Sequence, residues 1–274
     1  MPNITNTTAD VFLAEVFSKE VIRETNPKLV LAKLVKRFDD EARMGNDSIS
    51  VPSITNFVAN DKVSNIPVSF QANTETDIVI SIDQHKETSF LLEDITELQS
   101  KQDLMAHYTD AASTAIARAI DTSLAALALG FSTATGVYNT AITTDVVLNS
   151  IEALDLADCP EDDRSFVFRS DVKRDLLDLA AYTSSDFVGG KPTESGNIGR
   201  LYGVDTFMSN NLVFTGGTNR NNMLFHKDAL ALAMAQQPRA QAEYSVSQLG
   251  HELVVDTVYG VRELRDDFGV LVRT

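Results

Sequence analysis

The chain has 274 residues, and 23 basic against 39 acidic side chains give it a formal net charge of −16. A single cysteine, Cys159, allows no intrachain disulfide, so a disulfide-stapled scaffold is excluded. The acidic balance argues against a protein whose main task is to bind phosphate backbones. No secretory signal is visible, and no uninterrupted apolar run is long enough to cross a bilayer. The composition indicates an acidic globular protein that is made inside the cell.

The first segments in chain order have helical periodicity. The spacing of Thr7 and Asp10 is that of a capping box, an amphipathic helix is predicted over about residues 10–24, and Pro27 ends it. A second amphipathic segment stops near Gly45, and its inward positions are Leu31, Leu34, Val35 and Phe38.

Strict alternation then predicts strands. Apolar residues alternate over 49–51, 66–70 and 78–82, and Asn60 with Asp61 is typical of a turn. We interpret residues 49–70 as a long two-stranded ribbon. A two-stranded ribbon buries too little surface to be stable alone. Its apolar side chains therefore need a cover, from the rest of the chain or from another subunit.

One very long helix is predicted next. Thr96 and Gln99 form a capping box, and Gly130 is expected to end the helix in a left-handed conformation. About 33 residues between them correspond to nearly 50 Å of helix. This length exceeds the usual three to four turns, so the helix is expected to act as a structural axis.

The remainder has the pattern of an α/β region followed by returning strands. Thr144 and Ser170 are candidate helix caps, and residues 184–197 form a Gly/Ser-rich surface loop. Strands are predicted over residues 166–168, 204–208, 223–225, 253–261 and 270–273.

No motif for catalysis, cofactor binding or metal binding is found. The four histidines, His85, His107, His226 and His251, are isolated, and Cys159 precedes an acidic run that should raise its thiol pKa. Gly189, Gly190 and Lys191 are only superficially similar to a phosphate loop, because Ser185 and Pro192 break the motif. No catalytic, cofactor or metal residue is therefore predicted.

The order of segments resembles the HK97-type fold of major capsid proteins from tailed bacteriophages, over essentially the whole chain. The run from Gly45 to Pro52 is similar to the one with which such proteins begin an extended loop, although Asn46 is inserted. Further similar stretches are Ala119-Ile120-Asp121, Gly196 to Gly199, Gly203-Val204, Met208-Ser209-Asn210, Tyr259-Gly260-Val261 and Gly269 to Val272.

The resemblance implies an α+β fold with an N-arm, an extended β-hairpin called the E-loop, a long spine helix in a peripheral domain, and an α/β axial domain. The implied divisions are 1–26 for the N-arm, 27–46 for a helical connector, 47–82 for the E-loop and its base, 83–130 for the peripheral domain with the spine helix, 131–237 for the axial domain, and 238–274 for the return strands of the peripheral domain.

The same resemblance implies a structural protein without catalytic residues. It would assemble into pentamers and hexamers of an icosahedral shell around double-stranded DNA, in the host cytoplasm, and its final location would be the virion. Asn60, Asp61 and Lys62 would be inter-subunit contacts at the E-loop tip, and Gly189, Gly190 and Lys191 would belong to the axial loop.

The implied partners are copies of the chain itself, a separate scaffolding protein and a portal, with a decoration protein left open. Packaged DNA would be enclosed without sequence-specific binding, the acidic balance would keep it from sticking to the wall, and no membrane is involved. Some relatives cross-link a loop lysine to an asparagine. No asparagine occurs from Ala233 to Thr274, so no such cross-link is expected.

Two other interpretations remain open. One is an encapsulin-like nanocompartment shell, which shares the fold and would hold a cargo enzyme in place of DNA. The other is an acidic α/β enzyme whose ribbon is a dimerisation arm and whose site is assembled from scattered residues.

Overall fold

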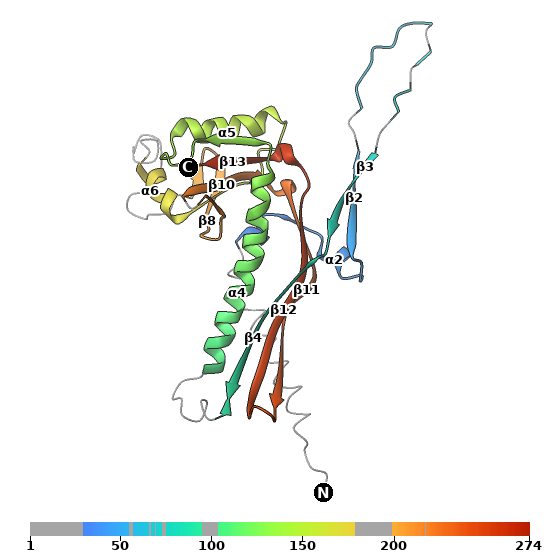
Figure 1. Ribbon diagram of the computed structural model, residues 1–274. Helices are drawn as coiled ribbons and strands as arrows, with labels where there is room; N and C mark the ends of the chain where they lie inside the picture. The colour runs from blue at the N-terminus through green and yellow to red at the C-terminus, as the bar shows by residue number, and fades with distance from the viewer. Residues whose placement is uncertain are drawn as a thin grey trace.

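Three parts make up the chain in the computed structural model: a head, a stalk and a projecting arm (Figure 1). The head is a seven-stranded sheet with helices α5 and α6, and the stalk is a four-stranded sheet beside the long helix α4. The arm is the two-stranded sheet of β2 and β3 with the loop that joins them. The structure describes residues 30–54, 57–65, 67–68, 70–72, 75–94, 104–178, 199–216 and 218–274.

Several sequence expectations concern residues outside those ranges. They are the helix over residues 10–24, the capping box of Thr96 and Gln99, and the loop over 184–197 with Gly189, Gly190 and Lys191.

The head confirms the predicted α/β region. Its strand order is β5-β13-β10-β6-β8-β7, with β9 beside β10, and β6–β8 and β5–β13 are the parallel pairs. The N-cap of α5 is Thr143, one residue before the predicted Thr144, because its hydroxyl accepts the Val146 N–H. The elements are β5 (Thr133–Gly136), α5 (Thr144–Leu156), β6 (Arg164–Phe168), α6 (Ser170–Asp178), β7 (Arg200–Leu201), β8 (Val204–Met208), β9 (Phe214–Thr215), β10 (Asn219–His226) and β13 (Gly269–Arg273).

The stalk is built on two long strands with α4 on one face (Figure 1). The sheet order is β1-β11-β12-β4, and Leu253, Val255 and Tyr259 on β12 are fully buried. Ile116, Ile120 and Leu124 of α4 belong to the same hydrophobic core, which continues into the head. The stalk elements are β1 (Lys36–Arg37), β4 (Gln84–Glu93), α4 (Leu104–Leu127), β11 (Leu230–Ser245) and β12 (Gly250–Glu263).

Strand β11, sixteen residues long, is the longest of the strands that sequence reasoning missed. Its first six residues, Leu-Ala-Leu-Ala-Met-Ala, are strong helix formers. In the fold Leu230 and Leu232 face the main core, whereas Ala231 and Ala233 face a second small core at the base of the arm. A strand buried on both faces lacks the polar alternation by which strands are recognised.

The spine helix is described from Leu104 onward, and its predicted start near Thr96 and Gln99 lies outside the described residues. α4 has 24 residues, which corresponds to about 36 Å. It then tightens into the 3₁₀ turn η2 (Ala128–Gly130), in which the Phe131 N–H bonds to the Ala128 carbonyl. Gly130 is not left-handed, contrary to the prediction, because this tight turn ends the helix without a positive φ.

The spine also corrects the expectation about membrane-spanning segments. Tyr108–Gly130 is long and apolar enough to cross a membrane by length and composition, although no single apolar run is. Half of its most apolar window is buried inside the fold. The core helix of a globular protein passes the same test, and Ile116, Ile120 and Leu124 show that α4 is such a helix.

The second amphipathic segment is broken into short pieces. They are the 3₁₀ turn η1 (Leu31–Lys33), the strand β1 and the short helix α2 (Asp39–Ala42). Leu31 and Val35 are buried, as their spacing predicted. The segment leaves the helical path because Lys36 and Arg37 pair in parallel with Ala231 and Leu232 of β11.

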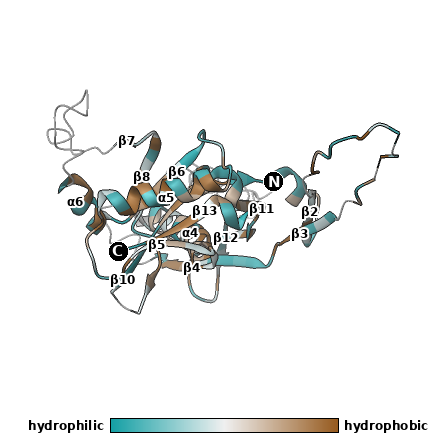
Figure 2. Ribbon diagram, turned by 90° about the horizontal axis from the view of Figure 1, so that it is seen from above, coloured by the Kyte–Doolittle hydropathy of each residue, from teal (hydrophilic) through white to brown (hydrophobic). Residues whose placement is uncertain are grey.

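The arm confirms the predicted ribbon but changes its pairing. β2 (Ser48–Ile54) pairs antiparallel with β3 (Glu75–Ser81), not with residues 66–70, which belong to the connecting loop. Ile49 lies opposite Ile80, and with Ala42, Ala231 and Ala233 they form the second small core. Seen from above, the arm projects sideways, well beyond the two larger sheets (Figure 2).

The base of the arm depends on close backbone packing at Gly260. A Cβ on Gly260 would collide with the Ser81 carbonyl, where β3 ends and the chain turns toward β4. We expect Gly260→Ala to lower the free energy of unfolding by about 1–3 kcal/mol, because the rigid backbone cannot yield. Gly130→Ala is the matched control, since it meets only the flexible end of the Glu263 side chain. Urea unfolding of the unassembled subunit measures both, and equal losses would contradict this account.

Candidate assembly surfaces

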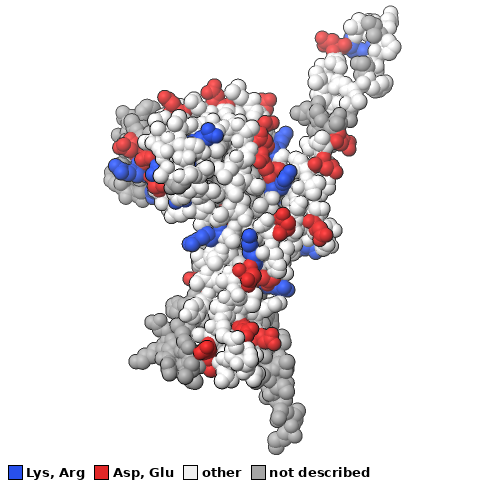
Figure 3. Space-filling model, in the orientation of Figure 1, with Lys and Arg blue, Asp and Glu red and all other residues white. Residues whose placement is uncertain are grey.

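The arm carries apolar side chains that the described part of the chain does not cover. Phe70 is 93% exposed and Phe57 is 67% exposed. The arm surface is also poor in charge, since residues 48–81 contain only Asp61, Lys62, Glu75 and Asp77 as charged groups, and Figure 3 shows it largely uncharged. Among the described residues, the other large apolar side chains exposed on the arm are Val58, Val63, Val68 and Val79.

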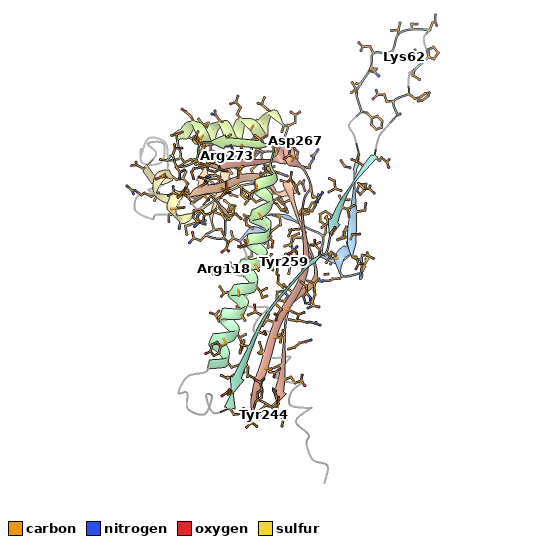
Figure 4. All side chains as sticks on the ribbon, viewed as in Figure 1. Lys62, Arg118, Tyr244, Tyr259, Asp267 and Arg273 are labelled. Atoms are coloured by element: carbon orange, nitrogen blue, oxygen red, sulfur yellow. The ribbon has the colours of Figure 1, made fainter. Side chains whose placement is uncertain are left out.

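The residues predicted for the loop tip lie in this loop. Asn60, Asp61 and Lys62 are exposed, and Figure 4 places Lys62 near the far end of the arm. The Lys62 ammonium donates to the Val63 carbonyl at 2.6 Å. Gly189, Gly190 and Lys191, the predicted axial-loop residues, are outside the described part of the chain.

The buried carboxylate of Asp121 connects three segments of the chain: the segment at residues 30–31, the helix α4 and the head. Asp121 of α4 is fully buried. It accepts the backbone N–H of Leu31 at 3.2 Å and that of Val30 at 3.4 Å, and it accepts the Asn211 side-chain amide at 3.2 Å. Burial raises the pKa of Asp121, although these hydrogen bonds oppose the rise. Asp121 thus connects the incoming N-terminal segment, the spine and the head.

A second cluster of polar side chains lies where the pairing of β11 with β12 in the stalk sheet is irregular. The register of β11 against β12 shifts on both sides of Gln236, next to Pro238, which has no N–H for the ladder. Asp256 of β12 accepts from Arg239 at 2.9 Å and from Gln236 at 2.7 Å, and it lies 3.3 Å from His85. Burial acts to raise the pKa of Asp256, but these three hydrogen bonds outweigh it and the pKa is lowered.

Catalytic chemistry is not assembled in the described residues. No group of three or more His, Cys, Asp or Glu residues within them could hold a metal ion. Cys159 is buried, and this burial, more than its acidic neighbours, raises the pKa of its thiol while Arg164 opposes the rise. A protonated, buried thiol is a poor nucleophile.

Comparison with known proteins identifies the class that the order of segments resembles, the phage capsid proteins. The family model described as phage capsid protein matches residues 30–260. A structure from Mycobacterium phage Che8 superposes with a TM-score of 0.78 at 26% identity, over 89% of this chain and 90% of that one. The capsid of Cyanophage P-SCSP1u gives 0.74 at 15% identity, over 89% and 87% of the two chains. No curated protein matches the sequence.

The same fold is also found in a virus-like particle. A virus-like particle from Pyrococcus furiosus superposes with a TM-score of 0.63 at 11% identity, over 95% of this chain and 99% of that one, which shows the shared fold alone.

The chain belongs to the phage capsid protein family. It is a major capsid protein with the HK97-like α+β fold, a structural protein of the virion that self-associates into an icosahedral shell and not an enzyme. The family match decides between the interpretations left open by the sequence and favours the phage shell.

Replacement of Asp121 tests whether its carboxylate holds these three segments together. In Asp121→Asn one carboxylate oxygen becomes an NH₂ group that faces other donors, so at least one buried N–H loses its acceptor. We expect the free energy of unfolding to fall by about 1–3 kcal/mol. Urea unfolding of the unassembled subunit measures it. Glu152→Gln, at an exposed acid on α5, is the control and should change little; an unchanged Asp121→Asn midpoint would refute the role of the junction.

Replacement of Asp256 has a pH-dependent effect. Because its pKa lies below the ordinary value of 3.8 in the folded state, Asp256 contributes stability above pH 3.8 that is lost as the pH falls through the lowered pKa. We expect Asp256→Asn to lose about 1–3 kcal/mol at pH 7 and to approach the wild type below pH 3.8. Urea unfolding across this range measures the difference, with the exposed neighbour Glu252→Gln as control. A difference that stayed constant down to pH 2.5 would contradict the assignment.

Proposed function

We propose that the arm is the principal inter-subunit contact of the shell, and that Asn60, Asp61 and Lys62 touch a neighbouring copy within pentamers and hexamers. One observation carries this proposal. The arm exposes Phe57, Phe70 and several valines, and among the described residues it projects away from the head and the stalk. Exposed apolar groups of this extent mark a protein–protein contact.

The arm is well suited to a weak contact that is repeated many times. Its strands are short, and its base is held by the second small core around Ile49 and Ile80. A single arm contact can therefore be modest, because a closed shell multiplies it by the number of copies.

The domain divisions are proposed on the same footing: N-arm 1–26, connector 27–46, E-loop and base 47–82, peripheral domain 83–130 and 238–274, and axial domain 131–237. The arm (48–81) and the head strands support the middle divisions. β11 runs continuously from Leu230 to Ser245, so the axial and peripheral domains share this strand across position 237.

The shell is proposed to enclose double-stranded DNA without reading its sequence. The outward face of α4 supports a wall that does not grip phosphates. Among the described side chains of α4, the exposed charged residues are one acid, Asp110, and one base, Arg118. Small exposed residues such as Ala111 and Ala115 lie near them. A separate scaffolding protein, a portal and a decoration protein remain proposals that follow from the family resemblance.

Replacement of Phe70 tests the arm contact. Because this side chain is 93% exposed, Phe70→Ser should leave the subunit fold unchanged by circular dichroism. The loss of a large apolar anchor at an interface is expected to weaken the contact by about 2 kcal/mol, roughly 30-fold, and shells should largely disappear from negative-stain micrographs.

Phe70→Leu is the matched control, since it keeps an apolar side chain, and it should retain most of the shell yield. Normal shells from Phe70→Ser and from the double variant Phe57→Ser/Phe70→Ser would refute the proposed contact.

A further inference from the structure

A single glutamine connects the two sides of the arm loop. The Gln71 side-chain oxygen accepts the Val58 backbone N–H at 3.1 Å, and the Gln71 side-chain amide donates to the Val58 carbonyl. One side chain therefore satisfies both backbone groups of a residue on the opposite side of the loop. This is the pattern by which a neighbouring strand would pair with Val58.

Backbone pairing does not extend into the described part of the loop. β2 ends at Ile54 and β3 begins at Glu75, so twenty residues separate the paired strands. Between described residues of the loop, no backbone–backbone hydrogen bond joins the two sides. A long loop without such bonds samples many conformations, and their loss on binding opposes association.

The bridge lies where the arm presents its apolar side chains. Phe57 precedes Val58, and Phe70 precedes Gln71, so the largest exposed side chains of the arm flank the two bridged residues. Holding Val58 against Gln71 fixes the backbone from which both rings project. The hydrogen bonds of Gln71 therefore influence the proposed contact by orienting these rings, although Gln71 is itself polar.

We infer that Gln71 is a positioning residue, which pre-organises the arm loop in the free subunit so that Phe57 and Phe70 meet the next copy of this chain in one arrangement. The inference rests on the proposed arm contact and deepens it. The shape of glutamine is required, because glutamate has no N–H for the Val58 carbonyl, methionine has neither group, and asparagine is one methylene shorter.

The experiment compares Gln71→Met and Gln71→Glu with the wild-type full chain. Gln84→Met is the matched control, because Gln84 is also surface-exposed in part and its side chain bonds only to the neighbouring Asp83 side chain among the described contacts. The first measurement is amide hydrogen exchange in unassembled subunits, followed in peptides that contain Val58. The second is the rate of shell assembly by light scattering at fixed subunit concentration.

Loss of one hydrogen bond of ordinary strength should speed exchange at Val58 by about five- to tenfold in Gln71→Met and slow assembly by a similar factor. Gln71→Glu keeps an acceptor for the Val58 N–H and loses only the donor to the Val58 carbonyl, so its exchange at Val58 and its assembly rate should lie between those of the wild type and Gln71→Met. Gln84→Met should match the wild type in both measurements. The circular dichroism spectrum should not change in any variant.

The failures of the two ideas are distinguishable. If Gln71→Met exchanges and assembles like the wild type while Phe70→Ser does not assemble, the arm contact stands and the positioning role of Gln71 is wrong. If exchange at Val58 accelerates but assembly keeps its wild-type rate, the bridge exists and the inference of pre-organisation is overturned. If Phe70→Ser assembles normally, the proposed contact itself fails.

Discussion

The buried carboxylate of Asp121 is the constraint on which the arrangement of the chain depends. It lies on the spine helix and binds backbone groups that arrive from the N-terminal segment, together with an amide that arrives from the head. A carboxylate in a dry interior is costly unless donors surround it. Because its donors come from segments about ninety residues away on either side, satisfying this one group fixes how the incoming chain, the stalk and the head are joined.

The arm differs from the rest of the subunit, because the loop at its outer half leaves apolar side chains exposed. Its base is anchored by a small core of Ile49, Ile80 and alanines from β11, but its loop exposes apolar rings to water. A subunit that leaves such surface uncovered is incomplete as a monomer. In the contact that we propose, the same surface drives assembly when copies meet, and the Gln71 bridge would keep the loop in one arrangement for that contact.

Local patterns in the sequence predicted the strands of the arm and several short strands of the head. Strict alternation indicated β2 and β3, a short apolar run indicated β6, and Asn60 with Asp61 indicated a turn in the loop that contains Lys62. The pattern failed where both faces are buried: β11 shows alternating leucine and alanine and no polar residue at its start. It also failed between Leu31 and Ala42, where pairing with β11 and the bonds to Asp121 override the helical periodicity.

The sequence by itself indicated a shell protein and left two other interpretations open. It excluded catalytic motifs, showed a ribbon too thin to stand alone, and supplied an order of segments that resembles phage capsid proteins. Only the tertiary structure decided that β2 pairs with β3, that Asp121 is the shared acceptor, that Asp256 secures the bulge, and that Gln71 bridges to Val58. Each of these is a contact between residues far apart in the chain. Periodicity reports which side of an element is buried, but it does not report what that side meets.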